Sequence, residues 1–294
     1  MQIAEVKARA CELPAEKDVA LSRWSSTELA REAVARGIVE RISGVTVWRW
    51  LSADAIRPWN YRSWIFPRDP QFKHKAGRIL DLYEGRWEGQ LLEPGDCVVC
   101  ADEKPSIQAR RRIHESAAAK PGGEGQLVEH EYEREGALCY LAAWDARRAR
   151  IFDRCAAKDG IEPFDMLVEQ FMSVEPYRNA QRVFLVIDNG TAHRGKKSIK
   201  RLQGAWPNMI VVHTPVHASW LNQCEIYFSI VQRKALQPNN FADLDELERH
   251  LLAFGRRYEQ IAKPFEWKFT RKDLGQVLDR LDQAPQARPT QQAA

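Results

Sequence analysis

Short apolar runs rich in β-branched residues constrain the fold of this 294-residue chain more than any other feature. Residues 97–101 form one such run and lead into Asp102, and residues 183–187 form another and lead into Asp188. Runs of this length and composition predict buried strands. Open α/β sheets place their chemistry at the carboxyl ends of such strands, so both aspartates are candidates for a functional site. Glu225, early in a stretch with a helical pattern, is a third candidate acid.

Three converging carboxylates suit hard cations that prefer oxygen ligands, such as Mg²⁺ or Mn²⁺. Two such ions, about 3.5–4 Å apart, activate a water or a 3′-hydroxyl and stabilise the leaving oxygen of a phosphodiester. We therefore predict that the carboxylates of Asp102, Asp188 and Glu225 lie on the order of 4–8 Å apart around two ions. Glu103 competes with Asp102 for this role, but neighbours on a strand point to opposite faces, so only one of them can take part.

The order of the expected elements after residue 96 predicts a mixed sheet covered by helices. Three strands with close connections come first, and helices and strands alternate after them. The strands are expected at 97–101, 137–144, 149–155, 183–187 and 209–213, and the helices at 163–174, at 196–203 and from residue 219. A Gly- and Arg-rich insertion is expected over about 103–135, between the first two strands.

The first ~60 residues show helical periodicity instead. Ser25 and Glu28 form a capping box in front of the second of three expected helices, which cover residues 4–13, 25–36 and 43–51. A helix, a tight turn and a second helix have the layout of a helix-turn-helix. A helical cap on the rest of the protein is the alternative interpretation of the same pattern.

The third of these helices is the expected reader of DNA. Thr46 and Arg49 are three residues apart and share a helical face, so both are assigned to the major groove. Trp48 and Leu51 have the same spacing and are expected to pack together in the core of the small domain.

Basic residues cluster at several places, although the formal net charge is only +4. Arg194, Lys196 and Lys197 directly follow the second candidate aspartate and are expected to contact DNA phosphates. Two further clusters, at 110–112 and 147–150, fit either phosphate binding or an ordinary solvated face.

Polar residues near the acids are candidates for a supporting role. Asn222 lies three residues before Glu225 in the expected helix, so it would share the face of Glu225 and either orient its carboxylate or contact a phosphate. Asn189 and His193 follow Asp188 closely, and His193 is a candidate contact for DNA or the scissile phosphate. An ordinary structural hydrogen bond is an equally good interpretation of His193 and Asn222.

Three motifs resemble DDE transposases of the insertion sequence 630 family, which are bacterial relatives of the mariner transposases. They are residues 101–109, 187–194 and 217–228, and the resemblance extends over roughly residues 20 to 280. It implies a ribonuclease H-like fold in which Asp102, Asp188 and Glu225 bind two Mg²⁺ or Mn²⁺ ions. It also implies double-stranded DNA as partner, both transposon terminal repeats and target site, and a homodimer or larger assembly on that DNA.

These expectations give a domain plan and a function. We expect an incomplete helix-turn-helix region (1–56), an aromatic and basic linker that contains Arg62 (57–75), a catalytic domain (76–282) and a disordered tail (283–294). The expected function is a DNA transposase that cuts transposon ends and joins them to target DNA. An inactive DNA-binding relic that regulates transposition and a ribonuclease H-like nuclease without strand transfer are the alternatives. No apolar run approaches the ~20 residues needed to span a bilayer, so a cytoplasmic, nucleoid-associated bacterial protein with no membrane partner is expected.

Overall fold

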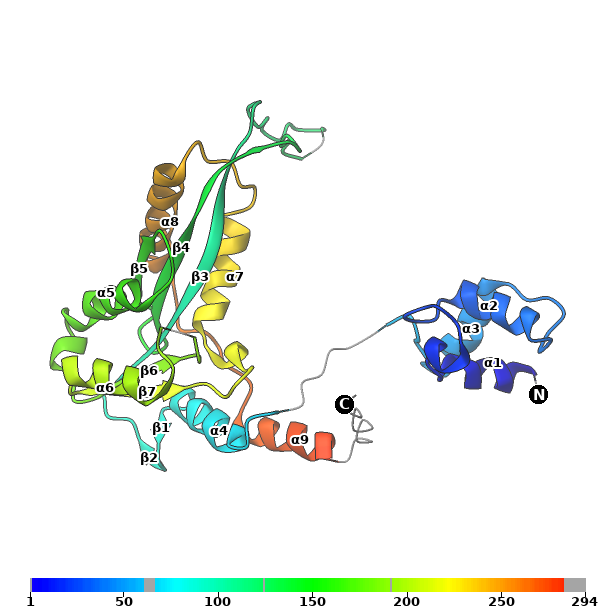
Figure 1. Ribbon diagram of the computed structural model, residues 1–294, viewed down its shortest axis with the longest axis horizontal. Helices are drawn as coiled ribbons and strands as arrows, with labels where there is room; N and C mark the ends of the chain where they lie inside the picture. The colour runs from blue at the N-terminus through cyan, green and yellow to red at the C-terminus, as the bar shows by residue number, and fades with distance from the viewer. Residues whose placement is uncertain (1, 61–66, 124, 191, 283–294) are drawn as a thin grey trace, which may run out of the picture. The chain divides into compact units, whose positions relative to one another are not determined.

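Ser25 and Ser43 each begin a helix in the amino-terminal part of the chain. The Ser25 hydroxyl accepts a hydrogen bond from the backbone N–H of Glu28 at 3.1 Å, and the Ser43 hydroxyl accepts one from Thr46 at 3.2 Å. Each serine thereby satisfies a donor that has no partner inside its helix. The computed structural model describes residues 2–60, 67–123, 125–190 and 192–282 and divides into two units, Met1–Phe66 and Pro67–Ala294. The first unit contains α1 (Gln2–Ala10), a short 3-10 helix (Pro14–Lys17), α2 (Ser26–Ala35) and α3 (Gly44–Ala53) (Figure 1).

Trp48 does not lie in the core of this unit, so the prediction made for it is wrong. Its side chain is 50% exposed, whereas Val47 and Leu51 are fully buried. Gly44 shows which face of α3 turns inward, because a side chain at that position would lie only 3.0 Å from Oγ1 of Thr27 at the start of α2. Gly44, Val47 and Leu51 share this face at helical spacing, and Trp48 lies on the face beside it.

A five-stranded mixed sheet forms the centre of the second unit. Its strand order is β5-β4-β3-β6-β7, in which β3 is antiparallel to β4 and parallel to β6. The pairs β4–β5 and β6–β7 are antiparallel and parallel, respectively. The strands are β3 (Cys97–Arg111), β4 (Glu133–Asp145), β5 (Ile151–Ala156), β6 (Val183–Ile187) and β7 (Met209–His213), and a small separate hairpin is formed by β1 (Arg86–Trp87) and β2 (Gln90–Leu91).

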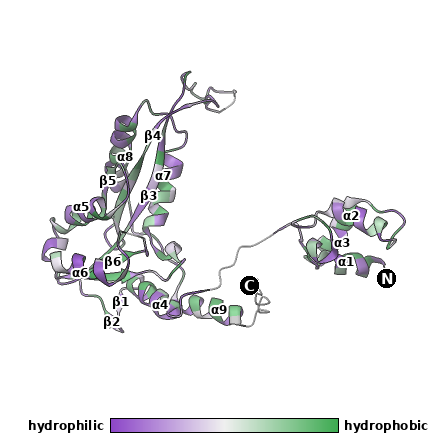
Figure 2. Ribbon diagram, in the orientation of Figure 1, coloured by the Kyte–Doolittle hydropathy of each residue, from purple (hydrophilic) through white to green (hydrophobic). Residues whose placement is uncertain are grey.

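Helices cover both faces of this sheet (Figure 1). One face packs against α5 (Ile161–Met172) and α6 (Gly195–Ala205), and the other against α4 (Phe72–Tyr83), α7 (Cys224–Lys234), α8 (Leu244–Glu259) and α9 (Arg271–Asp282). Alternate residues of β3 enter the two cores, so Val99 packs toward α5 and Val98 toward the opposite layer. Hydrophobic and hydrophilic residues alternate along the helices, since one side of each is buried (Figure 2). No helix among the described residues is long and apolar enough to cross a membrane.

β3 is much longer than expected. The sequence predicts a strand that ends at residue 101, but β3 continues to Arg111 and pairs with β4 along most of that length. A register shift between Lys104 and Ile107, with a positive φ of 58° at Ser106, lets the strand pass Pro105 without losing its partner. The insertion therefore starts after Arg111 rather than at 103.

The helix expected from residue 219 is interrupted before Glu225. A 3-10 helix (Ser219–Leu221) comes first, and α7 begins at Cys224. Asn222 separates them because its backbone is extended and its side-chain oxygen accepts a hydrogen bond from the N–H of Cys224 at 3.1 Å. Asn222 and Glu225 therefore do not share a helical face, and that part of the prediction is wrong.

Candidate active site

Asp102 and Asp188 lie at the same level on neighbouring strands. β3 and β6 run parallel with Cys100 opposite Val186, and each aspartate lies two residues further along its strand or just beyond it. Neighbouring strands are about 4.8 Å apart, so this register alone brings the two residues to one edge of the paired region.

Glu225 reaches the same region from the first turn of α7, which packs against β3 and β4. Asn222 fixes the chain just before it. Its side-chain amide donates a hydrogen bond to the carbonyl oxygen of Ala101 at 2.9 Å and lies 3.4 Å from Oδ2 of Asp102. Asn222 thus ties the start of α7 to the strand that carries the first acid, although by a different geometry from the one predicted.

The electrostatics of the site show that the acids sense one another. Burial, together with the negative charges of Asp188 and Glu225, raises the pKa of Asp102 to about 8. Asp188 behaves in the opposite way, because a hydrogen bond from His193 lowers its pKa below the ordinary value despite partial burial. At neutral pH Asp188 is therefore a carboxylate, while Asp102 retains its proton unless a positive charge arrives.

The donor set fits a divalent cation. All three side chains offer carboxylate oxygens, the ligand atoms that hard divalent cations prefer. Within the described residues, no three or more His, Cys, Asp or Glu side chains are gathered closely enough to hold a metal ion. Convergence within 4–8 Å stays a prediction.

His193 is buried in the core behind Asp188. Its imidazole is 0% exposed, and its ring centroid lies 4.6 Å from that of Phe164 with the two rings tilted by 37°. Nε2 lies 2.6 Å from Oδ1 of Asp188, and Nδ1 lies 3.6 Å from Oε1 of Glu103. Because it is fully buried, His193 offers no surface to a DNA phosphate, and its contacts are those of a support for Asp188.

Asn189 turns away from the acids. Its side-chain amide donates a hydrogen bond to the carbonyl oxygen of Thr214 at 2.8 Å, just after β7. It therefore anchors the loop after β6 to the neighbouring strand.

A groove leads away from Glu225 along β3. A cavity of about 300 Å³ next to Glu225 shares two lining residues, Lys104 and Gln232, with a second cavity of about 460 Å³. Arg233 contributes to the first cavity, and neither it nor Lys104 forms an ion pair with a described residue. The first cavity is lined by Lys104, Glu225, Phe228, Ser229, Gln232 and Arg233. Polar and basic residues that line the second are Lys104, Gln108, Arg110, Arg112, Gln232, Gln237 and Asn239.

The sequence argument missed Lys104 and Arg233, and it weighed Glu103 only as a rival of Asp102 for the metal. A signal was available for Lys104, which lies two residues after Asp102 and therefore on the same face of the strand. No local signal marks Arg233, because its relation to the groove depends on how α7 packs.

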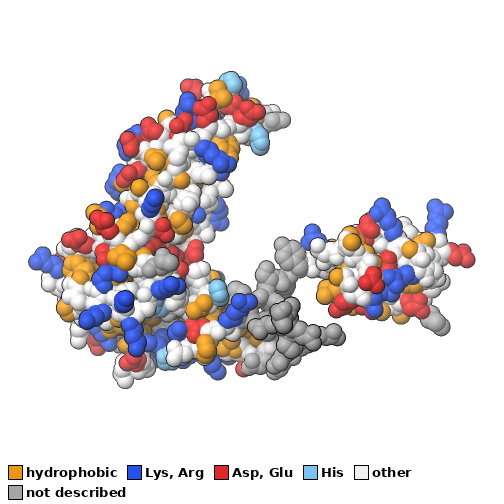
Figure 3. All heavy atoms as spheres, viewed as in Figure 1, with side chains coloured by type: hydrophobic (Ala, Val, Ile, Leu, Met, Phe, Trp, Pro, Cys, Tyr) orange, Lys and Arg blue, Asp and Glu red, His pale blue; other side chains and the backbone are white. Residues whose placement is uncertain are grey.

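The basic residues predicted to bind DNA on this unit lie at the start of α6. Arg194, Lys196 and Lys197 are all exposed. Figure 3 shows several Lys and Arg side chains at the surface over the end of the unit that carries α6. These three positions are available to an anionic partner.

On α3, Arg49 is exposed, whereas Thr46 is half-buried and its hydroxyl lies 2.9 Å from that of Ser43. Arg62 lies outside the described residues. Arg49 is thus the more accessible of the two predicted DNA-reading side chains.

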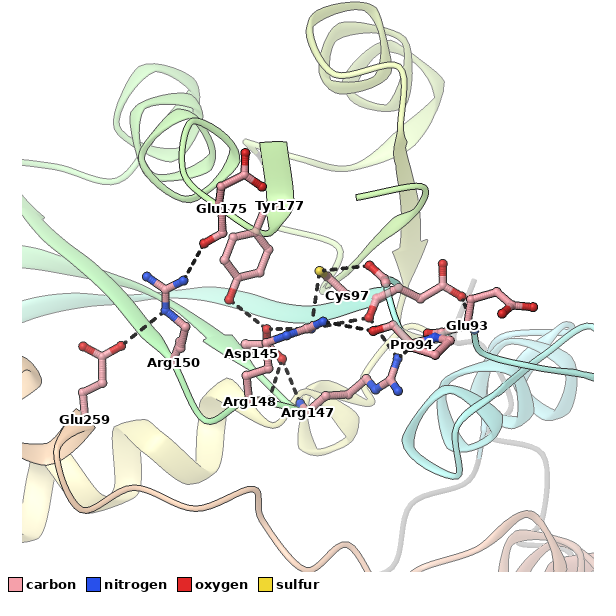
Figure 4. A network of polar contacts seen from close by, with 12 residues as sticks. Glu93, Pro94, Cys97, Asp145, Arg147, Arg148, Arg150, Glu175, Tyr177 and Glu259 are labelled. Carbon is pink, nitrogen blue, oxygen red and sulfur yellow. Dashed lines mark hydrogen bonds and ion pairs between the residues drawn. The ribbon is translucent and has the colours of Figure 1, made fainter. Parts of the chain in front are cut away.

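The arginine cluster at 147–150 is occupied by contacts within the protein (Figure 4). Arg148 pairs with Asp145, which is fully buried, at 3.4 Å. Arg150 donates a hydrogen bond to the carbonyl oxygen of Glu175 and lies 3.9 Å from the carboxylate of Glu259. These arginines fasten the β4–β5 turn to its surroundings, which favours the structural interpretation over phosphate binding.

A mixed sheet in this strand order, with acids at the end of β6 and within β3, defines a ribonuclease H-like protein. Residues 97–248 match the DDE superfamily endonuclease family, and the chain belongs to that family. A search of curated protein sequences finds no match.

Solved structures agree on the fold. The chain is similar to a Mos1 transposase paired-end complex with left transposon end, with 13% identity, a TM-score of 0.52, and coverage of 95% of this chain and 76% of that one. It is also similar to the mariner Mos1 paired-end complex with Mg, with 13% identity, a TM-score of 0.53 and coverage of 96% and 77%. The Mos1 mariner paired-end complex with Mn is also similar, with 14% identity, a TM-score of 0.50, and coverage of 90% of this chain and 80% of that one. The expected ribonuclease H-like mixed sheet, preceded in the sequence by a small helical region, is confirmed.

Proposed function

We propose that this chain is a DNA transposase related to the insertion sequence 630 family, which cuts transposon ends and joins them to target DNA. The observation that carries the proposal is that Asp102 and Asp188 lie at the same level of two neighbouring parallel strands, while the charges of Asp188 and Glu225 help to raise the pKa of Asp102. Membership of the DDE superfamily endonuclease family supports cleavage of a phosphodiester. Strand transfer and the use of two metal ions are part of the proposal.

In this mechanism the three carboxylates hold the cations, Mg²⁺ or Mn²⁺. When bound, the two ions activate the attacking oxygen and stabilise the leaving oxygen of the phosphodiester. The protein itself supplies orientation: Asn222 holds the start of α7 against β3, and the hydrogen bond from His193 holds Asp188 as a carboxylate. No covalent bond between the enzyme and DNA is needed, because positioning and charge stabilisation carry most of the catalysis of phosphoryl transfer.

The groove beside Glu225 supplies a path for the DNA backbone. Its cations are Lys104 and Arg233 near the acids and Arg110 and Arg112 further out, and Glu225 is the one carboxylate among the residues that line either cavity. Such a lining attracts phosphates and disfavours acidic proteins. In the proposed function, DNA also contacts Arg49 of α3 and the basic start of α6, and the active assembly is a homodimer or larger.

The test is a cleavage assay on the terminal DNA of the chain's own element, with Mg²⁺, with Mn²⁺ and with a chelator. Metal-dependent nicks at the element ends, followed by covalent joining to a target plasmid, are the expected result. Cleavage without joining would favour the nuclease alternative. DNA binding without any cleavage would favour the regulatory relic, and both outcomes would overturn the proposal.

A further inference from the structure

Glu103 is a nearly buried acid on the face of β3 opposite Asp102. Its side chain is only 11% exposed, and burial raises its pKa above the ordinary value, while the nearby His193 opposes that shift. A buried carboxylate without a partner destabilises a fold. The group that faces it is the imidazole of His193, with Nδ1 at 3.6 Å from Oε1.

One ring nitrogen of His193 contacts Asp188, and the other makes no hydrogen bond to a described residue. Nε2 lies 2.6 Å from Oδ1 of Asp188, and because a carboxylate oxygen has no proton to give, Nε2–H is the donor in this contact. Nδ1 is buried and has no hydrogen-bond partner among the described residues. A buried polar atom without a partner costs about 1–3 kcal/mol, so its position beside Glu103 calls for an explanation.

Only one of the two carboxylate oxygens of Asp188 accepts hydrogen bonds from described residues. Oδ1 accepts hydrogen bonds from His193 and from the backbone N–H of Gly190 at 2.7 Å, whereas no described residue donates to Oδ2. Gly190 makes this possible, because a Cβ there would lie 2.9 Å from Nε2 of His193 and 3.0 Å from Oδ1 of Asp188. The grip on Oδ1 leaves Oδ2 available to a cation.

We propose that Glu103 is a positioning residue that acts through His193: it holds the imidazole so that Nε2–H points at Oδ1 of Asp188 and Oδ2 faces the metal. Glu103, His193 and Asp188 then form a line of three side chains that passes from one face of the sheet to its edge. The part of this proposal that concerns the metal rests on the proposed function, in which Asp188 is a ligand. Partners of metal ligands orient them, and their removal costs about 10–100-fold in metal affinity.

The first experiment measures binding of Mn²⁺ to the full chain by electron paramagnetic resonance. Glu103→Gln keeps the shape but removes the charge, and it should weaken Mn²⁺ binding about 10-fold. Asp159→Asn is the matched control, because Asp159 is an exposed acid whose charge is felt by Glu103 but which has no contact with His193 in the structure. It should change the affinity by less than about two-fold. Equal affinities for the two variants would overturn the proposal.

A double variant tests whether the effect passes through His193. Once His193→Gln has removed the imidazole, adding Glu103→Gln should weaken Mn²⁺ binding no further. Full additivity of the two changes would mean that Glu103 acts on the metal directly, and the proposed line of contacts would be wrong. Circular dichroism of each variant confirms that it is folded before metal is added.

The second experiment needs neither metal nor DNA. The ¹⁵N signals of the His193 ring in the metal-free protein, assigned by their loss in His193→Gln, should move in Glu103→Gln and stay in place in Asp159→Asn. Unmoved signals in an enzyme that cleaves DNA would overturn the role of Glu103 and leave the proposed function intact. Moved signals and Mn²⁺ binding in a protein that never cleaves DNA would overturn the proposed function alone.

Discussion

Buried acids lie at two levels of the sheet, near the start of β3 and further along it, and only one group has cationic partners. Asp96 and Asp145, near the start of the strand, are both fully buried, and they pair with Arg182 at 2.5 Å and Arg148 at 3.4 Å. Asp102 lies further along, is 7% exposed, and has acids rather than cations as its charged neighbours. The paired acids fasten loops together. The unpaired acid is costly to the fold, and such costs are accepted mainly where a ligand removes them.

The largest expected effect is on catalysis. Replacing Asp188 with Asn removes a metal-binding charge but little volume, so cleavage of terminal DNA should fall by roughly 10³-fold or more. DNA affinity, measured by fluorescence anisotropy without metal, should change little. Cleavage near the wild-type rate would remove Asp188 from the site and, with it, the contrast between the two groups of acids.

Replacing one of the paired acids, Asp96 or Asp145, should instead lower the stability of the fold. Asp145→Ala leaves Arg148 without its partner, and it leaves the hydroxyl of Tyr177 without the acceptor that lies 2.8 Å away. The free energy of unfolding in urea should fall by about 3–5 kcal/mol, while the cleavage rate per folded molecule stays constant. A loss below about 1 kcal/mol would show that these contacts are not holding the turn.

The raised pKa of Asp102 should make the stability of the metal-free protein depend on pH. Its folded pKa of about 8 lies above the ordinary 3.8, so the folded state binds the proton more tightly. Stability is then greatest at low pH and is lost as the pH rises from about 4 through about 8. Asp102→Asn cannot ionise, so it should be more stable than wild type by several kcal/mol at pH 8 and equal to it at pH 4. Urea titrations in chelator at both pH values decide this, and a gap that does not change with pH would contradict it.

The smallest expected effect concerns the groove. Arg233→Ala should weaken DNA binding a few-fold and lower the salt slope by about one, because one phosphate contact is lost. Lys234→Ala removes the same charge from the next residue of α7, but Lys234 lines neither cavity. Identical losses in the two variants, titrated over a range of salt concentrations, would mean that charge alone matters and that the groove does not carry the backbone.

Two strands of the sheet, β6 and β7, could be predicted because each is a short apolar run. β6 and β7 have the predicted bounds, 183–187 and 209–213, since continuous apolar runs leave little freedom for their ends. The length of β3 could not be predicted in the same way. Its outer half contains Pro105 and polar residues, and it continues as a strand only because a bulge and the partner β4 maintain the pairing.

The acids of the site were found from sequence because they follow these strands, but their supports were not. The role of Asn222 depends on a carbonyl oxygen 121 positions away, on Ala101. The approach of Glu103 to His193 depends on how the loop after β6 folds back on the sheet. Trp48 shows the same limit within one helix, because helical spacing allowed more than one inward face and Gly44 decided between them.

The unbroken course of β3 also sets a distance. Asp102 and Arg110 belong to one strand, and eight residues of strand span roughly 26 Å at about 3.3 Å each. Base pairs of duplex DNA follow one another at a nearly equal step, about 3.4 Å. The spacing of residues along β3, counted from Asp102, is therefore nearly equal to the spacing of base pairs in its proposed substrate. Because the length of β3 is fixed by hydrogen bonds to β4, lengthening it by two residues, which keeps each side chain on its face, would shift the outer arginines by about two base pairs relative to the place of cutting.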